Sequence, residues 1–330
     1  MYFPNIALEY YTFERFSLKV SNQQELLVIT PVYNGEKYIE ATIKSVLKAR
    51  IPSMTYLVVN DGSTDGTAEI LRKYLGRIDV IEQANNGEGN AVNAGFAASE
   101  SKYVMVVSAD DLVDENIFRR LIQVLEENPE VSVAYPDWEM INDQGDVISQ
   151  IETPEFSISA LIEKMICLPG PGALIRRSSL DRDYLRNDSY IYVGDFECWL
   201  NLARFTSFIR VPEYLARWRL HGTNMSIKGR NVLMAEERIR VYKELLMLTK
   251  TQKPLKILVQ KGLGTAYYSS AKLVYFDSNI PAKTYLIKSF YWNFFLTRDF
   301  FAIGFILSTK YLRKSLTPLL NSLLQRNESA

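Results

Sequence analysis

Two adjacent carboxylates, Asp110 and Asp111, follow an apolar run of five residues that starts at Tyr103. Neighbouring carboxylates repel each other and lose solvation unless a cation or hydrogen-bond donors lie between them. Carboxylate oxygens at the edge of a sheet suit Mg²⁺ or Mn²⁺, which usually takes its other ligands from phosphate and water. The pair therefore either holds a divalent cation, or one of its members caps the helix that is expected near Glu115.

Two earlier segments end in residues that suit a nucleotide. Pro31 and Tyr33 end the apolar run that starts at Leu26, and Pro31 has no backbone donor, which suits the end of a central strand. The ring of Tyr33 would then project at the edge of the sheet and stack on a flat heterocycle. Asp61 precedes a glycine and would accept hydrogen bonds from a base or a ribose, although an Asp-Gly pair after a strand is usually only a turn.

The elements that must position these residues alternate between apolar runs and stretches with helical spacing. The runs lack polar alternation, as expected for strands that helices cover on both faces. We therefore predict an α/β protein with a mainly parallel sheet flanked by helices, whose ligands bind beyond the carboxyl ends of the strands. The predicted strands are 26–29, 56–59, 80–81, 103–107 and 131–134, and the predicted helices are 39–49, 67–75, 90–98, 115–127 and 197–205.

Composition excludes several classes of protein. The chain has 330 residues, of which 47% are hydrophobic and 23% charged, as is typical of a globular protein. Basic and acidic residues both total 38, so we expect no nucleic-acid partner. Two cysteines, and a start without an uninterrupted apolar stretch, favour a cytoplasmic protein over a secreted, disulfide-rich one.

The C-terminal third differs from the rest of the chain in charge. Residues 1–227 carry a net charge of −11 and residues 228–330 carry +11. The second segment has helical spacing and many aromatic residues, above all between Phe290 and Leu307, and its uncharged stretches are too short to span a bilayer. These rings either contact the inner face of a membrane peripherally, pack against the rest of the chain or form a homodimer interface.

The order of the motifs resembles the family 2 glycosyltransferases, which have the glycosyltransferase-A fold. The resemblance runs from Leu26 to Ser226 and includes the glycine-rich loop 85–95 and the carboxylate pair. It implies a nucleotide-diphospho-sugar donor, with a UDP-sugar favoured, Mn²⁺ or Mg²⁺ on the diphosphate, and transfer with inversion to a glycan or lipid-linked acceptor. Carried over, Pro31 and Tyr33 would line the base pocket, Asp61 would hold the uracil or ribose, and Asp110 and Asp111 would serve the ribose and the metal.

The resemblance also implies roles for residues further along the chain. Asp195 would be the general base that takes the proton of the acceptor hydroxyl, the other interpretation being a helix cap. His221, the chain's only histidine, would bind the metal or steady the diphosphate, unless it is a core or surface histidine. Arg219 would add charge against the leaving group. Gly172 lies where the family shapes its acceptor pocket, and Gly194 stands where the family usually has an acid.

Two other classes of protein share parts of this pattern. A Rossmann dehydrogenase needs a Gly-x-Gly-x-x-Gly turn after its first strand, whereas Gly87 and Gly89 follow the third strand and Val92 takes the last glycine's place. A non-catalytic nucleotide-sugar-binding module is the alternative, because Ser108 and Gly194 both depart from the family's fullest acidic pattern.

We therefore predict an inverting hexosyl- or N-acetylhexosaminyl-transferase of bacterial surface polysaccharide or glycan synthesis. The predicted organisation is an N-terminal extension at 1–24, a nucleotide-sugar-binding and catalytic domain at 25–227, and a helical, basic and aromatic region at 228–330.

Overall fold

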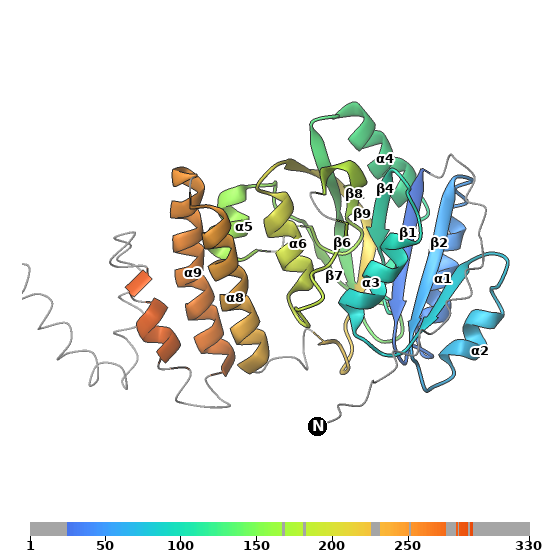
Figure 1. The fold of residues 1–330 in the computed structure, drawn as a ribbon. Helices are drawn as coiled ribbons and strands as arrows, with labels where there is room; N and C mark the ends of the chain where they lie inside the picture. The colour runs from blue at the N-terminus through green and yellow to red at the C-terminus, as the bar shows by residue number, and fades with distance from the viewer. Residues whose placement is uncertain are drawn as a thin grey trace, which may run out of the picture.

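The protein is an α/β fold built on one mixed sheet (Figure 1). The computed structural model describes residues 25–166, 169–180, 183–225, 232–250, 252–274, 282, 284–289 and 291–292. The predicted N-terminal extension and most of the aromatic residues between Phe290 and Leu307 lie outside these residues. In the described part the sheet has nine strands in the order β3-β2-β1-β4-β8-β6-β9-β5, with β7 paired to β6.

The first half of the sheet is parallel, as predicted. It contains β1 (Leu26–Val32), β2 (Met54–Asp61), β3 (Asp79–Gln83) and β4 (Tyr103–Val106). Successive residues of β1 face opposite layers, because Leu26 and Val28 belong to one apolar cluster and Leu27 and Ile29 to another. Burial on both faces explains why these runs lack polar alternation.

Helices cover both faces of the sheet. One layer contains α1 (Ile39–Lys48), α2 (Thr67–Arg72) and α4 (Ile117–Glu127), and the other contains α3 (Glu88–Ala97), α5 (Ile158–Lys164), α6 (Gly194–Leu202), α8 (Val232–Leu248) and α9 (Lys253–Val274). The helices predicted from the sequence are all present, with ends shifted by up to three residues. The predicted α/β class is therefore confirmed.

The second half of the sheet contains four strands that the sequence did not predict and one, β6, of which it predicted residues 131–134. It consists of β5 (Leu112–Val113), β6 (Val131–Ile141), β7 (Val147–Ile151), β8 (Leu174–Arg176) and β9 (Ser207–Arg219). β8 is antiparallel to both β4 and β6, whereas β9 is parallel to β6 and antiparallel to β5. Because Leu112 pairs with Arg217, the end of β9 lies beside the two carboxylates that precede β5.

The C-terminal helices α8 and α9 lie side by side next to α5 and α6 (Figure 1). The hydroxyl of Tyr242 donates to the carbonyl of Ile162 at 2.5 Å. Tyr242 also belongs to the same apolar cluster as Ile29 of β1 and Trp199 of α6. The described part of the region after residue 227 therefore shares its core with the sheet. Within the residues described, no helix has the length and apolarity needed to cross a membrane.

Candidate active site

The loops that follow β1 and β2 are tied together at the carboxyl edge of the sheet. The amide of Asn34 donates to Oγ of Ser63 at 2.9 Å, and Oδ1 of Asn34 accepts from the amide of Thr64 at 2.7 Å. Pro31 is buried within β1, one residue before the strand's last position. Tyr33 lies beside the tied loops and is 52% exposed. Its ring is therefore accessible to a ligand.

Asp61 is the last residue of β2 and holds the loop that leads into α3. Its Oδ1 accepts from Nε2 of Gln83 at 2.7 Å and from the amide of Asn86 at 2.9 Å, and its Oδ2 accepts from the amide of Gly87 at 2.8 Å. The carboxylate is nearly inaccessible to solvent. The structure therefore places Asp61 at the expected strand end, where its three protein donors order the loop.

The adjacent carboxylates occupy different environments. Oδ2 of Asp110 lies 2.8 Å from Nε2 of His221, and the Asp110 side chain is 27% exposed. Asp111 is buried, and its Oδ1 accepts from the amide of Arg219 at 2.9 Å. Burial raises the pKa of the Asp111 carboxyl well above its usual range, and the charge of Asp110 adds to the effect. The structure therefore brings Asp110, and not Asp111, to the accessible position beside the histidine.

The ring of His221 is oriented by two neighbours. Nδ1 accepts from the amide of Thr223 at 3.3 Å and lies 2.7 Å from its hydroxyl oxygen, and the ring centroid is 4.7 Å from that of Tyr38. These contacts assign the hydrogen of the neutral ring to Nε2, which donates to Asp110. In the other tautomer Nδ1 would donate to the Thr223 hydroxyl, which frees the Nε2 lone pair for a cation.

Arg219 and Gly172 have partners within the protein. Arg219 is buried; its Nε donates to the carbonyl of Asp110 at 2.9 Å, and Nη1 donates to the carbonyls of residues 142–143 at 3.1 and 3.0 Å. Its guanidinium thus holds the Asp110 loop against the turn after β6. Gly172 is buried at φ +80, where a Cβ atom would lie 2.8 Å from Cδ1 of Ile117. Packing and backbone conformation therefore both require this glycine.

Asp195 is exposed in the first turn of α6, where its Oδ1 accepts from the amide of Phe196 at 2.6 Å.

Glu88, the first residue of α3, was not singled out from the sequence, which marks it only as an acid in a glycine-rich loop. Surrounding protein raises the pKa of the Glu88 carboxyl although solvent reaches the side chain; Arg186 opposes the rise, and Asp195 and Asp110 reinforce it. Glu88 and Asp195 both lie near Arg186, because Cβ atoms on their neighbours Gly89 and Gly194 would each come within 3.8 Å of the Arg186 side chain.

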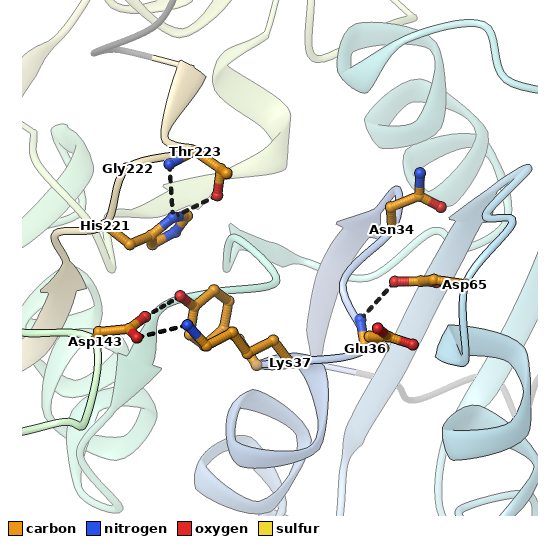
Figure 2. Close-up of a pocket in the computed structure, with 9 residues that line it drawn as sticks. Asn34, Glu36, Lys37, Asp65, Asp143, His221, Gly222 and Thr223 are labelled. Carbon is orange, nitrogen blue, oxygen red and sulfur yellow. Dashed lines mark hydrogen bonds and ion pairs between the residues drawn. The ribbon is translucent and has the colours of Figure 1, made fainter.

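A cavity of about 470 Å³ has His221 in its wall (Figure 2), and His221 in turn pairs with Asp110. One wall comes from the tied loops and the other from the segment that contains His221. The lining residues are Asn34, Glu36, Lys37, Tyr38, Asp65, Asp143, His221, Gly222 and Thr223. Lys37 forms an ion pair with Asp143, and the amide of Glu36 donates to Asp65 at 3.0 Å. The volume is that of a small-molecule site.

The donor atoms of this region fit a divalent cation that shares its ligands with a substrate. Among the described residues, no three His, Cys, Asp or Glu side chains gather around one point. Asp110 and His221 offer one carboxylate oxygen and one ring nitrogen. Mg²⁺ and similar cations are commonly held by one or two protein ligands, with phosphate oxygens and water completing the coordination.

Comparison with known proteins supports the expected family. Residues 27–183 match the model of Glycosyl transferase family 2. An uncharacterized glycosyltransferase of Haemophilus influenzae is 29% identical over an alignment of 214 positions that covers 60% of this chain and 66% of that protein. The poly-beta-1,6-N-acetyl-D-glucosamine synthase of Staphylococcus epidermidis is 25% identical over an alignment of 345 positions that covers 93% of this chain and 81% of the synthase.

Solved structures share the fold. The S. aureus TarS 1–349 complex with UDP has a TM-score of 0.63 at 17% identity, covering 80% of this chain and 78% of that one. A mannosyltransferase from Pyrobaculum calidifontis, in complex with GDP-Man and Mn²⁺, has a TM-score of 0.54 at 16% identity, covering 90% of this chain and 84% of that one. At such identities the likeness shows the fold, which is the glycosyltransferase-A type expected from the sequence.

Proposed function

Because the chain belongs to the family 2 glycosyltransferases, we propose that it transfers a sugar from a nucleotide-diphospho-sugar to an acceptor hydroxyl with inversion at the anomeric carbon. The observation that carries the proposal is the Asp110–His221 pair at the carboxyl edge of the sheet, next to an open cavity. A glycan or a lipid-linked sugar is the proposed acceptor. Relatives named as polysaccharide synthases support a role in bacterial polysaccharide synthesis.

The donor nucleotide binds, in this proposal, across the ends of β1 and β2. The exposed ring of Tyr33 stacks on the base, with Pro31 behind it in the strand. Asp61 keeps the loop at residues 85–87 in place beside the base and ribose. A UDP-sugar is the favoured donor, because similar structures hold UDP and UDP-GlcNAc.

Mn²⁺ or Mg²⁺ is the proposed cofactor, held by Asp110 and His221. The sequence favours Asp111 as the metal ligand, but the burial of that side chain and its bond to the amide of Arg219 favour its neighbour instead. When bound, the cation stabilises the negative charge that grows on the departing diphosphate. The hydroxyl of Thr223 supports His221 by accepting from Nδ1 in the tautomer that binds the cation.

Asp195 is the proposed general base. The acceptor oxygen attacks the anomeric carbon from the side opposite the diphosphate, its proton passes to the Asp195 carboxylate, and the bond from the anomeric carbon to the diphosphate oxygen breaks. Asp195 is exposed at the start of α6, so an acceptor can reach it. The amide of Phe196 donates to its carboxylate and so orients it at the start of the helix.

The proposal is tested by presenting the purified chain with a panel of UDP- and GDP-sugars, with and without Mn²⁺. Release of the nucleoside diphosphate and transfer of labelled sugar are measured. We expect cation-dependent turnover with at least one donor. Tight binding of donors without hydrolysis or transfer would instead support the non-catalytic binding module.

We also propose a cytoplasmic location, with the region at 228–330 contacting the inner face of the membrane or a second copy of the chain. The basic charge of this region motivates the proposal. Co-sedimentation with anionic liposomes at low and high salt tests the membrane contact, and light scattering tests the homodimer.

A further inference from the structure

Two buried hydrogen-bond donors near the proposed base have no acceptor among the described residues. They are Nη1 of Arg186 and Nε1 of Trp199. Arg186 is 8% exposed, and its guanidinium carbon lies 5.7 Å from the centre of the Trp199 ring. Buried donors, above all charged ones, are normally hydrogen-bonded. This pair of unpartnered donors therefore suggests a ligand group that supplies acceptors.

The fold fixes Arg186 between α3 and α6. Oδ1 of Asn93 accepts from the amides of Leu185 and Arg186 at 3.0 and 2.9 Å, and Nδ2 of Asn93 donates to the carbonyl of Arg186 at 2.7 Å. The side chain passes the start of α6, where a Cβ atom on Gly194 would lie 3.8 Å from Cδ of Arg186. Arg186 therefore lies next to Asp195, on an anchored backbone.

The charges around Arg186 are those of the reaction site. A Cβ atom on Gly89, the neighbour of Glu88, would lie 3.8 Å from Cβ of Arg186, and one on Gly194, the neighbour of Asp195, would lie 3.8 Å from its Cδ. Neither the Glu88 nor the Asp195 carboxylate is hydrogen-bonded to Nη1. Gly194 has no side chain that could occupy the space beside the guanidinium. A positive group with unused hydrogen-bonding capacity thus lies beside Asp195 at the start of α6.

We infer that Arg186 binds a carboxylate of the transferred sugar, so that the donor is a nucleotide-diphospho-hexuronate. A guanidinium binds the two oxygens of a carboxylate in a planar, bidentate arrangement. The inference rests on the proposed function, because Asp195 and Asp110 mark where the anomeric carbon and the diphosphate lie. The sugar between them is the part of the donor that reaches Arg186.

Calorimetric titration of the full chain in the presence of Mn²⁺ tests the inference. The probes are UDP-glucuronate and UDP-galacturonate, compared with UDP-glucose, UDP-N-acetylglucosamine and UDP alone. We expect at least one uronate to bind about tenfold or more tightly than the neutral sugars, as a charge-assisted pair would require. Arg186→Gln should remove this preference and leave the affinity for UDP unchanged, and Arg186→Lys should restore part of it.

Arg204→Gln is the matched control, because Arg204 lies beyond the other end of α6 and also has a buried Nε without a partner. This variant should keep the preference for uronates. Equal affinity of the parent chain for charged and neutral sugars, or equal weakening of all donors in Arg186→Gln, would overturn the inference and leave the proposed function standing. Failure of UDP and every UDP-sugar to bind would overturn both.

Discussion

At the scale of single residues, two adjacent side chains of the same type have different partners, because they leave the backbone in different directions. Asp110 and Asp111 are neighbours in sequence, but one side chain faces His221 and the other faces the backbone of Arg219. The sequence places both at the edge of the sheet. It does not reveal which one is buried, because that depends on the unpredicted strand β9 and on residues more than 100 positions away.

Asp110→Asn should weaken Mn²⁺-dependent binding of UDP by at least about tenfold, or about 1.4 kcal/mol of binding free energy. The reason is that the substitution removes a charged oxygen next to His221. Asp111→Asn should keep the dependence on Mn²⁺, because its side chain is buried against the Arg219 amide. Calorimetry with and without Mn²⁺ measures both effects, and the opposite ranking of the two variants would return the metal to Asp111.

Asp195→Asn should lower turnover by about 10²–10⁴-fold and leave the dissociation constant of the donor nearly unchanged. The physical reason is that the amide keeps the shape of the side chain but does not accept the hydroxyl proton. Initial rates of sugar transfer and calorimetry of UDP binding separate the two quantities. A variant that transfers sugar at the parent rate would exclude Asp195 as the base, and Glu88 would then be the next carboxylate to test.

At the scale of elements, the parallel half of the sheet was predictable, whereas in the other half only the start of β6 was. The runs in β1, β2 and β4 are apolar on both faces, so their sequence pattern is strong. β9 is long but carries buried and exposed residues in irregular order, and its register with β6 shifts near Asp137. The ends of β9 and α6 nevertheless position His221 and Asp195. The motif that includes His221 was thus found from the sequence, without the strand that positions it.

An ion pair with a buried carboxylate lies at the shifted register between β6 and β9. Nε and Nη2 of Arg210 donate to Asp137 at 2.9 and 2.6 Å, and the hydroxyl of Thr153 donates at 2.7 Å. Burial alone would raise the pKa of Asp137, but these hydrogen bonds outweigh it and hold the pKa below the usual range. The stabilisation from Asp137 is therefore complete above the unfolded-state pKa of about 4 and is lost as pH falls through the lower folded-state value.

Asp137→Asn should lower the free energy of unfolding by about 1.5–3 kcal/mol at pH 7, because it removes the charged acceptor of Arg210 and leaves the exposed Glu155 as its ionic partner. The difference from the parent chain should shrink as the pH falls below about 4. Urea denaturation across this pH range measures it. Glu69→Gln removes an exposed pair with Arg72 and should change stability by less than about 0.5 kcal/mol. A deficit for Asp137→Asn that stays constant with pH would contradict the assigned ionisation.

Helix α8 holds the segment that leads to Asp195. Glu237 is 4% exposed, and its two carboxylate oxygens accept from the amides of Ile191 and Tyr192 at 2.8 Å each. Glu237→Gln replaces one of the two acceptors with a donor, so we expect a loss of about 1–3 kcal/mol in the free energy of unfolding. Turnover should fall more than donor affinity, which transfer rates and calorimetry would show. A purely structural role would lower stability and leave turnover of the folded fraction unchanged.

At the scale of the whole molecule, the change of net charge at residue 227 predicts a domain boundary. The apolar core nevertheless extends across it. Phe196 and Trp199 of α6 belong to the same apolar cluster as Tyr242 of α8 and Leu263 of α9. Contacts of this kind join residues that are distant in sequence, so neither charge nor periodicity reveals them. The described helices after residue 227 therefore support the interpretation in which part of the C-terminal region packs against the rest of the chain.

A chain that ends at residue 227 should accordingly lose its cooperative thermal transition or become insoluble. Removal of α8 and α9 would expose Phe196 and Trp199 to water and leave the amides of Ile191 and Tyr192 without the Glu237 carboxylate. A chain that ends at Trp292 keeps every contact described above and is the matched control. Circular dichroism melts and size-exclusion chromatography compare the two. If the shorter chain melted cooperatively within a few degrees of the control, the catalytic domain would fold independently, and the shared apolar cluster would contribute little to its stability.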